Sequence, residues 1–270
     1  MAKVIAICNH KGGVAKTTTT MNLGIGLARE EKSVLLIDAD SQGNLTSALG
    51  WRNGDDRLDT TIASFISESI KGNDYDVTKG ILNHEEGVDL LPANCELAEW
   101  EVMLVTAMNR ERVLRNIISQ VKERYDYILI DSPPSLGMMT INALAAADSV
   151  IIPVEADGFS LNGTKQLMRT INKTRQHINN ELKVEGILVT RADFRTTFPG
   201  ETKATLDEAF KKYINVFDVM IPEAVSTKRA VNQGKSIFEY DNKNPVAKAY
   251  GELTKALIKN KERNFDGIVR

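Results

Sequence analysis

One stretch near the start of the chain, residues 3–20, constrains the fold more than any other. It reads K-V-I-A-I-C-N-H-K-G-G-V-A-K-T-T-T-T. The apolar run at residues 4–8 has the length and the β-branched content of a buried parallel strand. A turn containing Gly12 and Gly13 follows, and the apolar pattern after it predicts a helix from about Thr17. A strand, a glycine-rich turn and a helix in this order predict an α/β fold.

The turn has the composition of a phosphate-binding loop. Its glycines let backbone N–H groups point inward, and the helix N-terminus adds partial positive charge. We expect the Lys16 ammonium to reach the β- and γ-phosphates of a nucleotide and the Thr17 hydroxyl to bind Mg²⁺. His10 and Ala15 occupy positions that are glycine in the common G-x-x-x-x-G-K-[ST] pattern. The predicted nucleotide contacts of this loop are Lys11, Gly12, Gly13, Val14, Ala15, Lys16, Thr17 and Thr18.

Two further predicted strands end in aspartate. Residues 33–38 are followed by A-D-S-Q-G-N, and residues 125–131 by S-P-P-S-L-G. Ligands bind at the carboxyl ends of the strands in open α/β sheets, so Asp38, Asp40 and Asp131 are predicted to lie beside the phosphate loop. Hydrolysis of Mg·ATP needs carboxylates that order the metal shell or hold the attacking water. We therefore predict that Asp131 holds the Mg²⁺ shell.

The rest of the chain continues the alternation of strands and helices. Further strands are predicted at residues 88–91, 149–154, 183–190 and 216–221. Further helices are predicted at residues 45–49, 60–69, 96–108, 111–124 and 202–213, with a long helix ending near residue 177 and a last helix at residues 244–261. We expect one domain over residues 1–270: a doubly wound, mostly parallel sheet with helices on both faces, and a tail of about residues 262–270.

The composition and charge of the chain indicate its cellular compartment and the kind of partner it binds. Cys8 and Cys95 fit no metal or redox spacing, and two isolated cysteines are typical of a reducing compartment. No apolar stretch approaches the ~20 residues that span a bilayer, and the N-terminus does not have the pattern of a signal peptide. The net charge is −2, but residues 228–270 hold ten Lys or Arg and five Asp or Glu. We expect a cytoplasmic protein with a basic C-terminal part.

Four ordered segments resemble the deviant Walker-A ATPases of the ParA/MinD superfamily. They are K-G-G-V-A-K-T-T, D-A-D-S-Q-G-N, D-S-P-P-S-L-G-M-M-T-I-N-A-L and the I-P loop at Pro222, and they span most of the chain. Ala15 departs from the glycine of most members, and Ser41 from the usual proline. No helix-turn-helix precedes the phosphate loop. The chain therefore resembles the small ParA/Soj-type ATPases that partition plasmids or chromosomes.

This resemblance implies a reaction and an oligomeric state. ATP and Mg²⁺ are the expected ligands, and the expected reaction is slow hydrolysis of ATP in a nucleotide-dependent sandwich homodimer. Lys11 is implied to reach the partner's ATP, Asp40 to position or activate water, and Asp38 to support the metal or the loop. The S-P-P-S-L-G loop is implied to sense the γ-phosphate, and the loop after Pro222 to line the adenine pocket. Glu155 or Asp157 is a hypothetical contact of the other subunit's Lys11.

The basic C-terminal part suggests a site for non-specific nucleoid DNA. Arg195 falls where relatives carry a DNA-binding arginine, whereas another such position is Ser226 here. Lys228 or Arg229, expected in a loop, could replace it. The predicted DNA-binding residues are Arg191, Arg195, Lys228, Arg229, Lys248, Lys255 and Lys259. By resemblance, a ParB-type centromere-binding protein stimulates hydrolysis.

Two alternatives share most of these features. A ParA-like ATPase could position other cargo, such as conjugation or chemotaxis machinery, and the sequence does not separate this role from DNA partition. A MinD-like septum-placement ATPase would need an amphipathic C-terminal membrane helix. The end of this chain, E-R-N-F-D-G-I-V-R, is short and carries two acids, so we expect no membrane partner.

Overall fold

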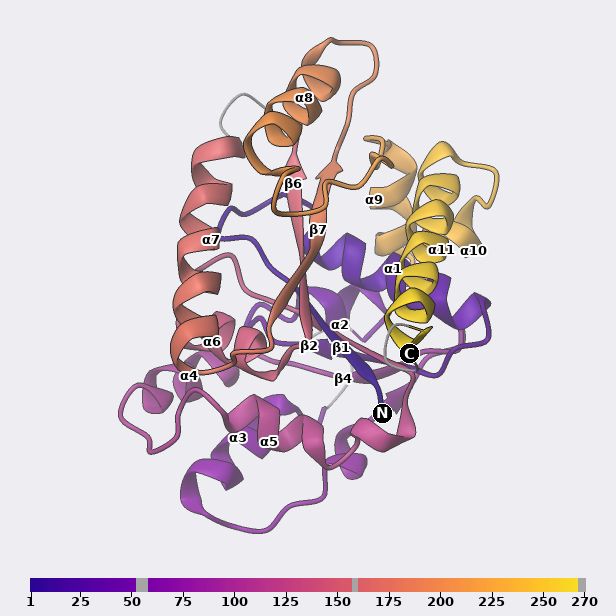
Figure 1. Ribbon diagram of the computed structural model, residues 1–270. Coiled ribbons are helices and arrows are strands. Elements are labelled where there is room, and N and C mark those ends of the chain that lie inside the picture. The colour runs from indigo at the N-terminus through magenta and orange to yellow at the C-terminus, as the bar shows by residue number, and fades with distance from the viewer. Residues whose placement is uncertain (52–57, 157–159, 267–270) are drawn as a thin grey trace.

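The computed structural model describes residues 1–51, 58–156 and 160–266, and within them seven strands form one sheet. The spatial order is β3-β4-β2-β5-β1-β6-β7, and only the pairing of β3 with β4 is antiparallel. The predicted doubly wound, mostly parallel sheet is thus confirmed (Figure 1). The strands are β1 (Lys3–Ile7), β2 (Val34–Asp38), β3 (Leu82–Asn83), β4 (Asp89–Leu91), β5 (Tyr127–Asp131), β6 (Ser149–Glu155) and β7 (Lys183–Thr190).

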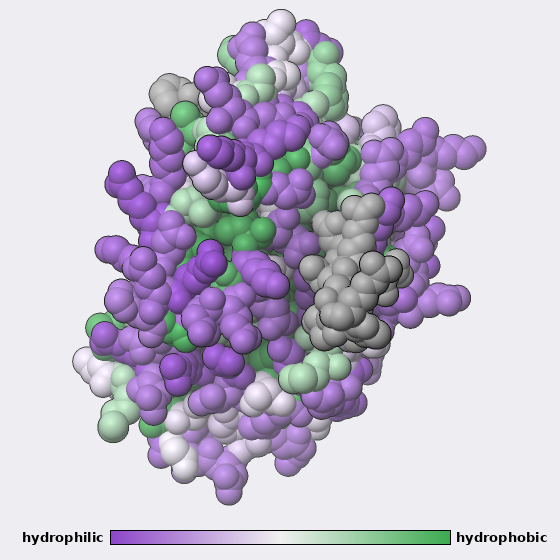
Figure 2. All heavy atoms as spheres, in the orientation of Figure 1, coloured by the Kyte–Doolittle hydropathy of each residue, from purple (hydrophilic) through white to green (hydrophobic). Residues whose placement is uncertain are grey.

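The interior strand β1 contributes side chains to two hydrophobic cores. Val4 and Ala6 join one buried cluster, whereas Ile5 and Ile7 join the other. Alternate side chains of a strand point to opposite faces of the sheet, so an uninterrupted apolar run supplies both cores. In the orientation of Figure 1, the surface in Figure 2 is mostly hydrophilic, and apolar side chains are visible between the α7 and α11 sides, over the sheet.

Helices cover both faces of the sheet. One core holds residues of α3 (Ile62–Lys71), α4 (Leu97–Leu104), α5 (Val113–Ser119), α6 (Met138–Ala146), α7 (Ser160–His177) and α8 (Phe198–Phe210). The other holds residues of α1 (Lys16–Arg29), α2 (Asn44–Ala48), α10 (Ile237–Tyr240) and α11 (Pro245–Asp266), with α9 (Val225–Asn232) packed against it. None of the helices in the described ranges combines the length and apolar character of a membrane span.

The predicted strand at residues 216–221 is wrong. This segment runs beside β7 but forms only two isolated bridges in the described structure, Ile187 with Val216 and Ala192 with Pro222. Backbone hydrogen bonds occur near Phe217 and again at Ile221, and the residues between them leave the ladder. Burial of Val216, Phe217 and Ile221 explains the strand-like apolar pattern.

Several helix boundaries also differ from the prediction. Lys228 and Arg229 lie in helix α9 rather than in a loop. The predicted helix at 111–124 is divided into α5 and a 3₁₀ turn at Lys122–Arg124. Helix α6 was missed because it is almost entirely buried and has no polar face to give a helical period. The last helix continues to Asp266, into the predicted tail.

Candidate nucleotide-binding site

The phosphate loop connects the carboxyl end of β1 to the N-terminus of α1. Gly13 and Ala15 both have positive φ, at 77° and 61°. Ala15 is left-handed (ψ 31°) and is the N-cap residue of α1. A side chain in this conformation costs about 1–2 kcal/mol, whereas glycine adopts it freely. The departure from the usual glycine at position 15 is therefore a local strain in this loop.

Hydrogen bonds to the backbone of β6 and to a side chain of β7 hold the loop in place. The Asn9 amide donates to the carbonyl of Pro153 at 2.7 Å, and its side-chain oxygen accepts from the Lys11 backbone N–H at 3.0 Å. The hydroxyl of Thr190, at the end of β7, lies 3.1 Å from the carbonyl oxygen of Val14. Neither support is predicted from the sequence, because neither belongs to a phosphate-binding pattern.

Lys16 lies at the first turn of α1, with its side chain almost fully buried. Its ammonium donates to the carbonyl of Lys11 at 3.1 Å, so the side chain crosses the loop. Burial lowers the pKa of Lys16, and the carboxylate of Asp131 opposes this shift. A polyanionic ligand would likewise favour the charged ammonium.

Thr17 and Asp131 meet at the floor of the site. The Thr17 hydroxyl donates to Asp131 Oδ2 at 2.6 Å, and the Thr20 hydroxyl lies 3.4 Å from Oδ1. Asp131 is 1% exposed at the end of β5. Burial first, and the nearby Asp38 carboxylate second, raise the pKa of Asp131. The carboxylate and the hydroxyl predicted to order Mg²⁺ are thus adjacent.

Asp38 and Asp40 differ in their surroundings. Asp38 is fully buried, and its oxygens accept hydrogen bonds from the backbone N–H of Asp40 and from the N–H and hydroxyl of Thr46. Burial raises the pKa of Asp38 to about 6. Asp40 instead lines the cavity and is held by one hydrogen bond, from the Gln42 N–H to its Oδ1 at 3.0 Å. This geometry favours a loop-supporting position for Asp38 and a reactive one for Asp40.

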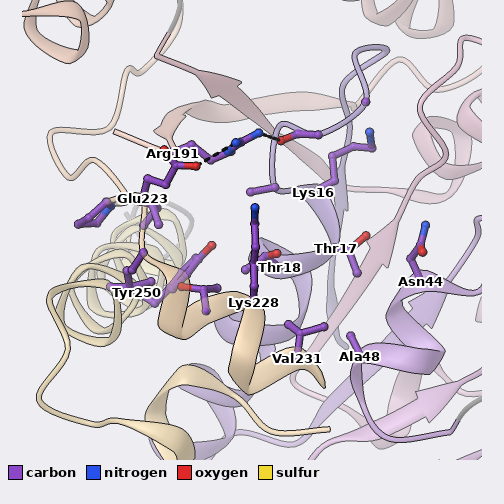
Figure 3. Close-up of a pocket in the computed structure, with 18 of the residues that line it drawn as sticks. Lys16, Thr17, Thr18, Asn44, Ala48, Arg191, Glu223, Lys228, Val231 and Tyr250 are labelled. Atoms are coloured by element: carbon purple, nitrogen blue, oxygen red, sulfur yellow. Dashed lines mark hydrogen bonds and ion pairs between the residues drawn. The ribbon is translucent and has the colours of Figure 1, made fainter. Parts of the chain in front are cut away.

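A cavity of about 450 Å³ lies over the phosphate loop (Figure 3). Its polar side is formed by Gly12, Gly13, Lys16, Thr17, Thr18, Asp40 and Asn44. Its apolar side is formed by Ala48, Ile221, Pro222, Ala224, Val231, Val246 and Tyr250. Pro222, which the sequence predicts to contact nucleotide, lines this cavity. The contribution of α11 was missed, because Val246 and Tyr250 read from the sequence as an ordinary apolar helix stripe.

Arg191 lies at the mouth of this cavity, not on an open surface. Its guanidinium contacts the carbonyl of Gly13 at 3.1 Å, Glu223 at 2.9 Å and Glu155 at 3.1 Å. Glu155 also accepts the ammonium of Lys11 at 3.2 Å. The hypothetical contact between Lys11 and Glu155 thus occurs within one chain. Asp157, the other hypothetical partner, lies outside the described residues.

Except for Lys228, the other predicted DNA-binding residues lie outside the cavity, on two parts of the surface. Arg195 is 88% exposed in its side chain, yet it forms a two-pronged pair with Asp193 at 2.8 and 2.7 Å. The remaining basic side chains are exposed on α9 and α11: Arg229, Lys248, Lys255 and Lys259. Lys228 instead lines the nucleotide cavity. The predicted DNA-binding set is therefore divided between the cavity and the outer surface.

Replacing Ala15 by glycine is expected to raise the free energy of unfolding by about 1 kcal/mol, because glycine removes the left-handed strain. Urea denaturation of the wild type and the Ala15→Gly variant measures this change. Ala28→Gly is the matched control: Ala28 lies within α1, where glycine should lower stability by about 1 kcal/mol. Equal destabilisation by both substitutions would contradict the strained conformation at Ala15.

The fold and the site together define a P-loop nucleoside triphosphatase of the deviant Walker-A class. Residues 2–184 match the family described as AAA domain. The chain is 40% identical to the sporulation initiation inhibitor protein Soj of Bacillus subtilis over 262 residues, which are 96% of this chain and 100% of Soj. It is also 40% identical to the chromosome partitioning protein ParA of Myxococcus xanthus over 261 residues, 96% of this chain and 89% of that protein.

A solved structure agrees with this class. Cobyrinic acid a,c-diamide synthase from Mycobacterium smegmatis, with bound ATP analog and magnesium, has a TM-score of 0.84 and 32% sequence identity, and the match covers 97% of this chain and 96% of that chain. The chain belongs to the ParA/Soj family of P-loop ATPases.

Proposed function

We propose that this protein is a DNA-partition ATPase whose ATP-bound homodimer binds nucleoid DNA without sequence preference. The observation that carries the proposal is the second lysine, Lys11, on a phosphate loop beside a cavity that Lys16 and Asp40 line. The similarity to proteins named Soj and ParA supports partition as the use of this chemistry.

The nucleotide would bind along the phosphate loop, with Lys16 on its β- and γ-phosphates and Pro222 near its base. Among the described residues no group of three or more His, Cys, Asp or Glu could hold a metal alone. Mg²⁺ typically takes one or two protein ligands together with substrate phosphates, which fits the adjacent Thr17 and Asp131. When bound there, Mg²⁺ would neutralise charge on the phosphate oxygens.

Asp40 would then orient the attacking water. It is 6% exposed, lies on the cavity wall, and has one oxygen fixed by the Gln42 N–H. A carboxylate held in this way can accept a proton from water or align it for in-line attack. Asp38 would keep the loop between β2 and α2 rigid through its hydrogen bonds to Thr46.

Dimerisation would require Lys11 to change partners. Within one chain its ammonium is paired with Glu155, and the side chain of Lys11 is 41% exposed. A triphosphate on a facing subunit offers a larger negative charge than a single carboxylate. Transfer of Lys11 from Glu155 to the partner's ATP would couple nucleotide binding to association of two chains.

The DNA surface would be formed by Arg195, Arg229, Lys248, Lys255 and Lys259 in each subunit. Phosphate contacts of this kind give sequence-independent affinity that falls steeply with salt, and a dimer doubles their number. Stimulation of hydrolysis by a ParB-type centromere-binding protein would release the DNA, so that cargo follows the ATP-bound form along the nucleoid in the cytoplasm.

Binding to non-specific duplex DNA tests this function. Fluorescence anisotropy with ATP, ADP and a slowly hydrolysed ATP analogue, across a range of salt, should give tight binding in the triphosphate states only. The Lys11→Ala and Lys16→Ala variants should lose this binding. Absence of DNA binding in every state, with ATP hydrolysis intact, would reject the proposal in favour of another cargo; co-sedimentation with liposomes would then test the MinD-like alternative.

Arg195 and Asp193 should have opposite effects on this DNA affinity. Arg195→Ala should weaken binding and lower the salt slope by about one for each lost phosphate contact. Asp193→Ala should strengthen binding, because it releases the guanidinium from a fully satisfied pair. Anisotropy titrations of both variants at three or more salt concentrations measure these changes. Weaker binding by Asp193→Ala would show that Asp193 orients Arg195 rather than competing for it.

A further inference from the structure

Helix α9 presents two consecutive side chains to the nucleotide cavity. Thr227 and Lys228 both line it, whereas Arg229, the next residue, does not. In Figure 3 the amine of Lys228 points into the cavity from α9, on the side where Lys16 and Arg191 also lie. The sequence placed Lys228 and Arg229 in one DNA-binding loop, but the helix directs them to different surroundings.

The two polar groups of α9 that line the cavity have unused bonding capacity in the described structure. The Thr227 hydroxyl oxygen is buried and has no hydrogen-bond partner among the described residues. The ammonium of Lys228 forms no ion pair with any of them, although Lys203, Lys211 and Lys235 all do. A buried polar atom without a partner usually marks the place of a missing water or ligand.

The position along the cavity indicates which part of a nucleotide these groups would meet. Lys16 and Thr17 serve the β- and γ-phosphate end. Lys228 lines the same cavity, and in Figure 3 it lies between Thr17 on one side and Tyr250 on the other. This middle region corresponds to the portion that ADP and ATP share.

We infer that Lys228 binds the nucleotide itself, at the α-phosphate and ribose side, and that the Thr227 hydroxyl completes the same contact. This inference rests on the proposed ATPase function, since it names a further contact in the same cavity. An ammonium on a flexible stem suits a phosphate oxygen at the mouth of a cleft. Lys228 thereby fixes the nucleotide between phosphate loop and base, rather than adding to the DNA surface.

Titration of the full-length protein with fluorescent ADP and with a slowly hydrolysed ATP analogue tests the assignment. Lys228→Ala should raise the dissociation constants of both nucleotides by about tenfold, and Lys228→Arg should restore most of the loss. Lys243→Ala is the matched control, because it removes the same charge at an exposed position that neither lines the cavity nor belongs to the proposed DNA surface. It should leave both nucleotide constants unchanged.

A measurement of DNA affinity distinguishes the proposed nucleotide contact of Lys228 from a role in DNA binding. With nucleotide at saturation, Lys228→Ala should retain wild-type affinity for duplex DNA. Unchanged nucleotide affinity in Lys228→Ala, or a loss confined to the ATP analogue, would overturn the assignment. If the wild type binds nucleotide but not DNA, the partition proposal fails while the assignment of Lys228 is still decided by the same titrations.

Discussion

Lys16→Ala is expected to lower ATP affinity by about a hundredfold and to abolish measurable hydrolysis. The Lys16 ammonium is almost fully buried under the phosphate loop and 3.1 Å from the carbonyl of Lys11. A charge-assisted contact at such a site contributes about 1.5–3 kcal/mol, and no other side chain of α1 can supply the charge. Nucleotide titration and phosphate release measure the two effects.

The control for this substitution is Lys79→Ala. Lys79 is an exposed lysine on a short 3₁₀ turn at Val77–Gly80, so its loss should change neither measurement. Circular dichroism should show the same folded content in both variants. Retention of near-wild-type hydrolysis by Lys16→Ala would mean that this loop does not hold the phosphates.

Asp40→Ala is expected to have the second large effect, on the rate rather than on binding. Hydrolysis should fall by about a hundred- to ten-thousandfold, the usual contribution of a positioned acid–base group. ATP affinity should be retained or rise, because a negative charge is removed from a cavity that binds a polyanion. Single-turnover phosphate release, with nucleotide titration beside it, measures both quantities.

Asp38→Asn gives the matched comparison for Asp40. Asp38 is fully buried and hydrogen-bonded to Thr46, so this substitution should act on stability, which urea denaturation measures. Asp40→Ala should instead unfold like the wild type. Substantial turnover by Asp40→Ala would move the water-positioning role to another residue of the cavity.

The strand ends were predictable because short apolar runs followed by aspartate or glycine are a local signal. The predicted strand ends lie together at one edge of the sheet, because β5 pairs in parallel with both β1 and β2. Asp131 is opposite Ile7 on one side and Asp38 on the other. Edge segments were less predictable. Residues 216–221 have the apolar pattern of a buried strand. A strand in a sheet also needs continuous backbone hydrogen bonds to its neighbour, which the apolar pattern does not encode.

The directions of basic side chains could not be predicted from composition. Arg191 and Arg195 are four residues apart in the segment R-A-D-F-R, yet one contacts the Gly13 carbonyl and the other pairs with Asp193 at the surface. The difference arises at Arg191, which has a positive φ of 52° and turns back over the phosphate loop. A backbone conformation that only the folded chain stabilises leaves no mark in the sequence.

The contacts of Arg191 have a consequence for how the site opens. One guanidinium joins three separate segments: the phosphate loop at Gly13, the end of β6 at Glu155, and the segment after Pro222 at Glu223. These segments are more than 30 residues apart in sequence, but a movement of Arg191 breaks their shared contacts at once. We therefore expect them to open as one cooperative unit, so that their backbone amides exchange with solvent through a common opening rather than loop by loop.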